Sequence, residues 1–319
     1  MAGSEVALLT LDEQGAQLSP TLPLGGLCSE ILPTPDGGAL LSHSAGLTRL
    51  LPAALPTEAP RLDPLLTRRN LDGFERDRDG TLYLLEHPRE EHGEPAGPHA
   101  ILRLSVGGAL DTIATASPSA YDLTFDPSAR RLFVTHVSGR SVESWVEYQE
   151  RWVAEETRRV ELGAADAKER AAEPKDDAFW LARLLFLPPH GEPWLLLQGR
   201  EVKPRLAALL DAGGVRQVAA WPTAFLARNG VMNPSGDLLY LNAGRAIFLL
   251  QGGEAIAEPR RIELAATALA SDGDHLAVLS PLTAERSAVE LWDRTMKRRL
   301  ASTSTPGGAT ALAFLRAKP

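Results

Sequence analysis

The chain has 319 residues and a single cysteine, Cys28. One thiol cannot form an internal disulfide, and it cannot complete a zinc or iron–sulfur centre built from cysteines, because each of these needs at least two sulfur atoms. Proteins without disulfides are typical of reducing compartments. We therefore expect a cytoplasmic protein.

The chain also lacks long hydrophobic runs and an excess of basic residues. No apolar stretch approaches the roughly 18 residues that cross a bilayer, and the N-terminus reaches Asp12 and Glu13 without the basic start of a signal peptide. Its 33 Lys and Arg against 41 Asp and Glu give a formal net charge of −8, which repels phosphate backbones. We expect a soluble protein that binds neither membrane nor nucleic acid. Scarce lysine and frequent Arg, Ala, Leu, Gly and Pro suggest a bacterial source.

The abundant feature is a repeated hairpin. A short apolar strand, a turn rich in Pro, Asp, Ser and Gly, and a second apolar strand recur at 28–44, 71–87, 121–137, 182–199, 228–242 and 267–281. A second hairpin alternates with the first, as at 100–114, 205–219, 246–258 and 288–301. Turn residues between short strands indicate β-hairpins, and a repeated pair of hairpins is typical of a β-propeller blade.

The patterns at the two chain ends help to predict the number of blades. Residues 6–18 resemble an isolated second hairpin, and residues 309–319 resemble an isolated first strand. Together they predict a closing blade, because closure removes exposed sheet edges. The prediction is one all-β propeller over 1–319 with seven four-stranded blades, closed by N- and C-terminal strands. Six blades are the alternative, since the closing blade lacks one strand. An Ala-rich segment predicts a short helical insertion at 161–178.

One blade resembles the WD-repeat family. The segment VELWDRTMKRRLA carries Trp292 and Asp293 at the end of a third strand, followed by a turn that contains threonine. Met296 stands where that family usually has glycine. The resemblance implies the propeller fold.

A second segment, RNGVMNPSGDLLYLN at 228–242, resembles the repeated signature of six-bladed lactone hydrolases of the gluconolactonase type. The resemblance implies that Asn229 and Glu30 bind a divalent cation such as calcium. Asn242 departs from the signature, which ends in aspartate. Non-enzymatic propellers carry similar signatures, so fold analogy does not decide the function.

Propeller geometry places further polar residues around the channel mouth. The loops that lead into first strands and the loops between second and third strands open on the same face, and they carry His43, Asp72, His87, Asp122, His136 and Asn242. Their oxygens and imidazoles suit a divalent cation, or they are hydrogen-bonded loop residues. No Gly-x-Ser-x-Gly nucleophile elbow is present. Asp77 to Gly80 predicts a hairpin turn rather than a calcium loop.

Two insertions fall on the same predicted face, at 88–100 and 161–178, and long loops are often functional. Their acidic residues include Glu90, Glu91, Glu94, Asp166, Glu169 and Glu173. We therefore predict a non-catalytic scaffold that needs no cofactor and binds a protein partner on this acidic face, whose charge suits a basic partner. The alternatives are a metal-dependent lactonase or esterase-like hydrolase at the channel mouth, and a structural subunit of a multi-protein complex.

Overall fold

The computed structural model of the chain describes most residues between 5 and 315. The described residues are 5–6, 9–12, 15–18, 22–25, 28–34, 36–51, 60–67, 70–88, 97–136, 141–155, 157–159, 181–189, 192–199, 202–210, 215–221, 225–251, 259–306 and 311–315. The helical insertion predicted at 161–178 lies outside them. None of the described residues forms a helix, so this part of the chain holds no helix that could cross a bilayer.

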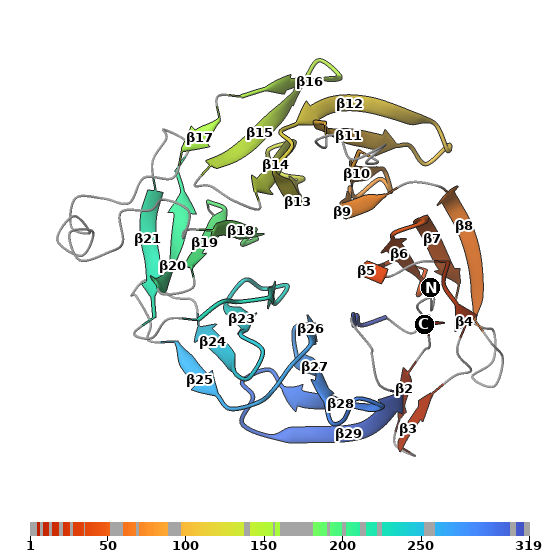
Figure 1. Cartoon of the computed structure of the whole chain (residues 1–319), viewed down its shortest axis with the longest axis vertical. Helices are drawn as coiled ribbons and strands as arrows, with labels where there is room; N and C mark the ends of the chain where they lie inside the picture. The colour runs from red at the N-terminus through yellow and green to blue at the C-terminus, as the bar shows by residue number, and fades with distance from the viewer. Residues whose placement is uncertain are drawn as a thin grey trace.

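Six blades of four antiparallel strands surround a central axis (Figure 1). The first three blades consist of β5 (Cys28–Pro33), β6 (Ala39–His43), β7 (Gly46–Leu51) and β8 (Arg61–Thr67); β9 (Leu71–Arg76), β10 (Leu82–Glu86), β11 (His99–Leu104) and β12 (Leu110–Ala116); and β13 (Ala120–Asp126), β14 (Arg131–His136), β15 (Ser141–Tyr148) and β16 (Arg151–Ala154), where β15 also pairs with β17 (Arg158–Arg159).

The other three blades follow in chain order around the ring. They consist of β18 (Leu181–Phe186), β19 (Trp194–Gly199), β20 (Val202–Leu209) and β21 (Val215–Ala220); β22 (Asn229–Met232), β23 (Leu238–Asn242), β24 (Ile247–Gln251) and β25 (Arg260–Ile262); and β26 (Ala268–Ser271), β27 (His275–Pro281), β28 (Arg286–Asp293) and β29 (Arg299–Pro306). Each blade joins one hairpin of each predicted kind, which confirms the propeller.

Burial along a blade explains why second strands have continuous apolar sequences. Every residue of β6 and of β23 is buried, because neighbouring blades cover both faces of these strands. The outermost strand β8 is exposed at alternate positions or more. A strand buried on both faces cannot alternate between apolar and polar residues, so the apolar runs mark the middle of each blade.

The core lies between blades. Leu40 and Leu47 of the first blade pack with Phe74 and Leu84 of the second. Equivalent clusters fill the other junctions between complete blades. Apolar burial is the main stabilising term in folding, so the junctions hold the ring together.

The closing sector differs from the prediction of seven blades. Between the first and the last blade the structure has two short sheets, in which β1 (Glu5–Val6) pairs with β4 (Leu22–Pro23) and β2 (Leu9–Asp12) pairs with β3 (Gly15–Leu18). Residues 311–315 lie here without forming a strand. Seven four-stranded blades are therefore not supported, and the six-bladed alternative is the observed number of complete blades.

Side-chain packing, rather than a shared sheet, links residues 5–6 and 311–315 in this sector. Leu315 packs with Val6 and Leu24 against the first blade, and Leu312 packs against the last blade. The predicted sheet between residues 6–18 and 309–315 is absent from the described residues. A segment as short as 311–315 satisfies both neighbouring cores with side chains alone.

The WD-like turn explains how Met296 replaces glycine. Asp293 accepts hydrogen bonds from the N–H of Arg298 at 2.5 Å and from the Thr295 hydroxyl at 2.5 Å, which closes the turn between β28 and β29. Met296 has a φ of 52°, a left-handed conformation that usually favours glycine. Its side chain is buried among residues that include Tyr240 and Val278, so packing offsets the backbone strain.

Candidate functional site on the mouth face

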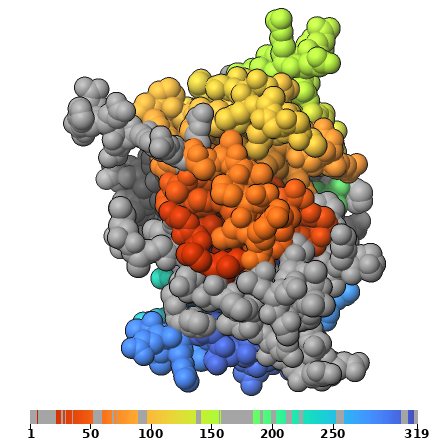
Figure 2. All heavy atoms as spheres, turned by 90° about the vertical axis from the view of Figure 1, so that its right-hand side faces the viewer, coloured from red at the N-terminus to blue at the C-terminus, as the bar shows by residue number. Residues whose placement is uncertain are grey.

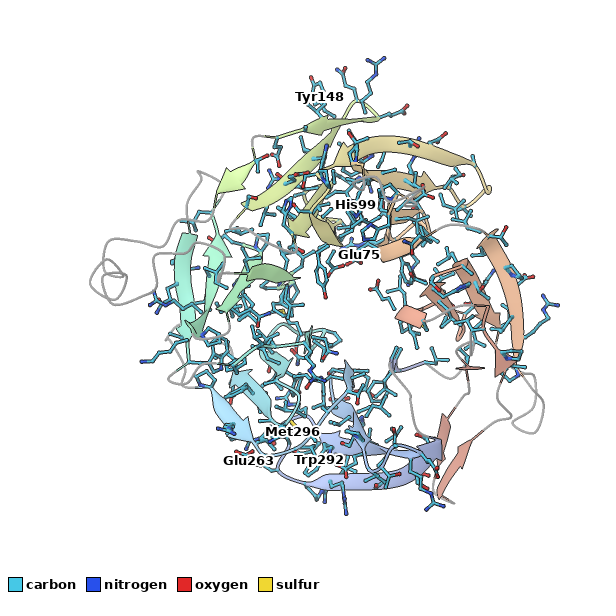
Figure 3. The ribbon with its side chains drawn as sticks, viewed as in Figure 1. Glu75, His99, Tyr148, Glu263, Trp292 and Met296 are labelled. Carbon is cyan, nitrogen blue, oxygen red and sulfur yellow. The ribbon has the colours of Figure 1, made fainter. Side chains whose placement is uncertain are left out.

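Three carboxylates from neighbouring blades lie on the channel wall. Glu30 is on β5, Glu75 on β9 and Asp122 on β13, the innermost strands of the first three blades. Figure 3 shows Glu75 at the inner edge of its blade, toward the centre of the ring. The N–H of Phe74 donates to Glu30 Oε2 at 3.2 Å, so the Glu30 carboxylate reaches the second blade.

Glycine at position 73 makes room for this arrangement. A Cβ atom there would lie 2.8 Å from Asp122 Oδ1, closer than real Cβ contacts allow. The Asp122 carboxylate therefore approaches the backbone of β9 from the third blade, while Glu30 approaches it from the first. Glu75 projects from β9 itself, so the three acids gather around one inner strand.

Burial and like charge change the acidity of this group. Burial raises the pKa of Glu75 to about 8, and the Asp122 carboxylate adds to the rise. Burial also raises the pKa of Glu30 well above its usual value, with Asp122 and Glu75 adding to the rise and the Phe74 N–H opposing it. Within the described residues neither glutamate forms an ion pair. Glu30 and Glu75 therefore retain protons near neutral pH.

A histidine cluster occupies the junction between the second and third blades. His99 Nε2 lies 3.4 Å from His87 Nε2, and the two ring centroids are 4.0 Å apart. His99 is fully buried, and its Nδ1–H donates to the Ser117 carbonyl at 3.1 Å. Figure 3 shows His99 in the body of the ring, between the blades. Burial lowers the pKa of His99, and His87 and His136 add to the decrease.

A serine, histidine and glutamate lie beside this pair. Ser119 Oγ is 2.9 Å from His136 Nδ1, and Ser117 Oγ is 3.1 Å from the same nitrogen. His136 Nε2 faces Glu143 Oε1 at 3.6 Å, which is too long for a hydrogen bond. Burial lowers the pKa of His136, whereas Glu143 opposes the decrease. The cluster therefore favours neutral imidazoles.

Other predicted mouth residues also have hydrogen-bond partners. His43 Nε2 is 2.8 Å from Thr48 Oγ1. Asn242 and Asn229 both donate to the Thr267 carbonyl, at 3.2 and 3.0 Å. Among the predicted mouth residues, His87 and His136 thus belong to the histidine cluster, and Asp122 belongs to the group of carboxylates.

Several predicted residues have no described side chain. The backbone of Asp72 belongs to β9, but its side chain lies outside the described part. The predicted partner-face residues Glu90, Glu91, Glu94, Asp166, Glu169 and Glu173 also lie outside the described residues. The acidic partner face therefore stays a prediction.

Neither the cysteine nor a metal cluster supplies obvious chemistry. Burial raises the pKa of Cys28 to about 11, with the Glu30 carboxylate adding to the rise and a backbone contact with Glu30 opposing it. A thiolate is the reactive form of cysteine. Among the described side chains, no group of three or more His, Cys, Asp and Glu residues is arranged to hold a metal ion.

Sequence reasoning missed Glu75, His99, Ser119 and Glu143. His99 had a usable signal, because it begins the third strand, HAILRL, and His87 directly follows the second strand. In a hairpin these two positions face one another across the loop. Glu75 had a weaker signal, since one charge within an otherwise apolar first strand does not reveal which side of the strand faces the channel.

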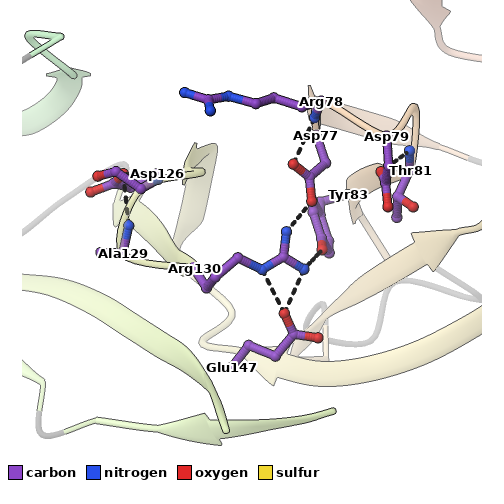
Figure 4. A network of polar contacts seen from close by, with 10 residues as sticks. Asp77, Arg78, Asp79, Thr81, Tyr83, Asp126, Ala129, Arg130 and Glu147 are labelled. Atoms are coloured by element: carbon purple, nitrogen blue, oxygen red, sulfur yellow. Dashed lines mark hydrogen bonds and ion pairs between the residues drawn. The ribbon is translucent and has the colours of Figure 1, made fainter. Parts of the chain in front are cut away.

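The opposite end of the same blades, here called the turn face, carries an ionic network (Figure 4). Arg130 donates to the carboxylate of Asp77, and its Nε donates to Glu147 Oε2 at 2.7 Å. Its Nη2 also donates to the Tyr83 hydroxyl at 3.3 Å. Gly80 has a φ of 93°, so Asp77 and Gly80 belong to a hairpin turn, as expected.

The surface also carries a projecting hairpin. Figure 2 shows β15–β16, in lime green, standing out from the body of the molecule. Tyr148 is 64% exposed and Val153 is 48% exposed on this hairpin. Single exposed apolar residues are common on monomeric proteins, so the predicted structural-subunit role is not decided by them.

Solved structures share the fold at low sequence identity. A functionally unknown protein from Desulfotomaculum acetoxidans matches with a TM-score of 0.61 and 9% identity, covering 95% of each chain. The Cps50 (Swd1) β-propeller domain of Myceliophteria thermophila matches with a TM-score of 0.61 and 12% identity over 91% of this chain and 90% of that one.

A putative 6-phosphogluconolactonase from Bacteroides uniformis matches with a TM-score of 0.55 and 14% identity, covering 82% of this chain and 78% of that one. No protein-family model and no curated protein sequence matches the chain. The matched structures support the WD-like and lactonase-like resemblances at the level of the propeller fold. Likeness at this identity shows the fold alone, because one fold hosts many functions.

Proposed function

We propose that the chain is a non-catalytic interaction platform that binds a basic segment of a protein partner at the wall of the central channel. The observation that carries this proposal is the pair Glu30 and Glu75, two partly buried carboxylates with raised pKa values and no ion pair among the described residues. Burying carboxyl groups without a cationic partner lowers the free energy of unfolding. A cationic partner group would offset that cost, which gives the acids a role in binding.

The proposal agrees with the charge of the whole chain, −8. Complementary charge accelerates association with a basic partner and makes it sensitive to salt. A Lys or Arg side chain near Glu30 and Glu75 would favour their ionised forms, so binding would release protons. Affinity should therefore increase from pH 6 to pH 9.

The test begins with capture of the tagged chain from cells that produce it, followed by mass spectrometry of bound proteins. The partner's dissociation constant is then measured for the wild type and for the variant Glu30→Gln/Glu75→Gln at two salt concentrations. We expect the variant to bind at least about tenfold more weakly at low salt. The exposed residue Glu263 provides a control, Glu263→Gln, which should bind like the wild type.

A specific observation also favours a second candidate, a calcium-dependent lactonase. Asn229 Oδ1 is buried without a hydrogen-bond partner among the described residues, as expected for an oxygen that binds a cation. Putative 6-phosphogluconolactonases occur among the similar structures. Calcium titration followed by a lactone hydrolysis assay tests this function, and Asn229→Ala should abolish both signals. Absence of calcium binding and of hydrolysis in the wild type would exclude it.

A further inference from the structure

One turn of the last blade concentrates positive charge. Lys297, Arg298 and Arg299 are the one run of three consecutive basic residues in the sequence, and all three are exposed. Lys297 and Arg298 lie in the turn between β28 and β29, and Arg299 begins β29. The whole chain has a formal net charge of −8, so this turn differs in sign from the chain as a whole. The turn is therefore a candidate surface for an acidic partner group.

Hydrogen bonds and packing hold this turn in one conformation. Asp293 Oδ1 accepts from the Arg298 N–H at 2.5 Å, and the Met296 N–H donates to the Asp293 carbonyl at 2.8 Å. The Met296 side chain is buried in the same cluster as Tyr240, whereas Lys297 and Arg298, which follow it, are exposed. The Asp293 carboxylate is thus bound to its own turn. Because the backbone that carries the two cations is already ordered, binding costs less entropy.

A third cation comes from the preceding blade. Arg260, on β25, donates to the backbone carbonyl of Thr295 in the same turn, so its guanidinium lies beside the turn. Within the described residues, the side chains of Lys297 and Arg298 form no ion pair or hydrogen bond, and Arg260 contacts a neutral carbonyl rather than a carboxylate. We call Arg260, Lys297 and Arg298 the basic turn patch. Its three positive charges have no carboxylate partner among the described residues.

The acidic residues near the patch are mostly paired with other basic side chains. Asp274, in the turn between β26 and β27, is the exception, and its backbone carbonyl accepts from the Arg294 N–H at 3.0 Å. Three cations of the patch thus outnumber one unpaired carboxylate, so the local charge is positive. The paired acids are Asp237 with Arg294 at 3.8 Å, Glu263 with Arg261 at 2.8 Å, Asp272 with His275 at 3.1 Å, and Glu290 with Arg299 at 3.0 Å.

We propose that the basic turn patch binds an acidic segment of a protein partner. A guanidinium donates two parallel hydrogen bonds to one carboxylate, so Arg260 and Arg298 suit Asp or Glu side chains. A short segment contacts the patch alone, whereas a long nucleic acid also meets the negative charge of the rest of the chain. The patch shares no residue with the channel wall and prefers the opposite charge. This binding is therefore separate from that proposed for Glu30 and Glu75.

The experiment titrates a fluorescein-labelled deca-glutamate peptide with the full-length chain and follows fluorescence anisotropy. Ionic strengths of about 10 mM and about 150 mM are compared, because the Debye length falls from about 30 Å to about 8 Å between them. We expect saturable binding that weakens with salt. Lys297→Gln/Arg298→Gln should bind at least about fivefold more weakly at low salt, because two of three cations are lost. Both side chains are exposed, so this variant is expected to fold.

Arg151→Gln/Arg216→Gln is the matched control, because it removes the same charge from exposed arginines of the third and fourth blades. This control should bind the peptide like the wild type. Glu30→Gln/Glu75→Gln should bind it at least as tightly, which separates this test from that of the channel wall. Absence of saturable binding by the wild type would overturn the proposal, and so would equal weakening by the two arginine variants. Tighter binding of a labelled DNA duplex than of the peptide would also overturn it.

Discussion

The junction between the second and third blades has polar groups at both ends, and the two ends are built differently. On the turn face, the Arg130 guanidinium forms ion pairs with the carboxylates of Asp77 and Glu147 and donates hydrogen bonds to both. At the mouth end of the same blades, His99 and His136 are buried and neutral, and on the channel wall between the two ends Glu75 retains a proton near pH 7. The turn-face groups stay charged because they are paired with one another. The other buried groups are held in their neutral forms.

The difference separates stabilising groups from groups that are available for binding. Breaking a satisfied ion pair leaves a buried charge and destabilises the fold. Replacing an ionisable group that burial holds neutral should instead leave the free energy of unfolding unchanged or raise it, because burying that group was unfavourable. Natural proteins retain unfavourable groups chiefly at functional sites. The mouth end and the channel wall are therefore the better candidates for function.

Arg130→Ala should have the largest effect. The variant leaves Asp77, which is 7% exposed, without its cation, and the φ of 51° at position 130 is equally unfavourable for both residues. Since the arginine is 40% exposed, we expect a loss of about 2 to 3 kcal/mol in the free energy of unfolding rather than the full cost of a buried pair. Urea denaturation at pH 7 measures it.

The control for this prediction is Arg103→Ala. Arg103 pairs at 3.2 Å with Asp111, which is 54% exposed, so its loss should cost below about 0.5 kcal/mol. Equal effects of the two variants would remove the distinction between the faces.

Glu75→Gln should act in the opposite direction, and mainly at high pH. The folded-state pKa of about 8 exceeds the unfolded value of 4.5, so the folded chain holds a proton that the unfolded chain loses, and stability falls as pH rises between these values. One pKa unit corresponds to about 1.4 kcal/mol. If the glutamine variant regains half of the free energy that corresponds to the pKa shift, the fold is stabilised by on the order of 2 kcal/mol at pH 8.5.

The same variant should gain less than half of that stabilisation at pH 5, where the unfolded chain still holds part of its protons. Urea denaturation at the two pH values measures the difference. Glu263→Gln, on an exposed side chain, should be insensitive to pH. Destabilisation by Glu75→Gln at pH 8.5 would show that the carboxylate has a structural partner.

Asp122→Asn should have a smaller effect than Glu75→Gln, and it tests how much the Asp122 charge contributes to the raised pKa values. Asp122 raises the pKa of both Glu30 and Glu75, but burial is the larger cause for each. Removing its charge should therefore lower both pKa values without returning them to the usual range. Carboxyl ¹³C NMR titration of the variant gives both midpoints, and unchanged midpoints would contradict the contact between these acids.

Ser119→Ala should have the smallest effect. His136 Nδ1 lies within hydrogen-bond distance of Ser117 Oγ as well, at 3.1 Å, so the nitrogen keeps a partner. Loss of one redundant bond should cost below about 0.5 kcal/mol. Thermal unfolding of Ser119→Ala tests this, with Ser117→Ala/Ser119→Ala as the comparison that removes both hydroxyls and should cost more.

Much of the fold could be predicted from the sequence, because each blade repeats a local pattern. Turn residues such as those at 77–80 and apolar second strands such as β23 mark the hairpins directly. The number of complete blades could not be predicted, because closure depends on how residues 311–315 pack. Side chains of Leu312 and Leu315 close the sector without the strand pairing that a hairpin pattern reveals.

The candidate site was only partly predictable, for a physical reason. Position in a blade places Asp122, His87 and His136 on the mouth face, but it does not show which of them meet. The reach of Asp122 past Gly73, and the contact of His87 with His99, depend on the spacing between blades. Such contacts join segments distant in sequence, and a single sequence carries no periodic signal for them.

The titration midpoint of Glu75 tests the central claim most directly. Carboxyl ¹³C NMR of the wild-type chain, with Glu75 assigned by comparison with Glu75→Gln, measures whether the channel wall suppresses the charge of its carboxylates. We predict a midpoint at about 8, as burial beside Asp122 requires. A midpoint near the usual 4.5 would mean that Glu75 is solvated or paired with a cation, and the proposed distinction between the two faces would be wrong.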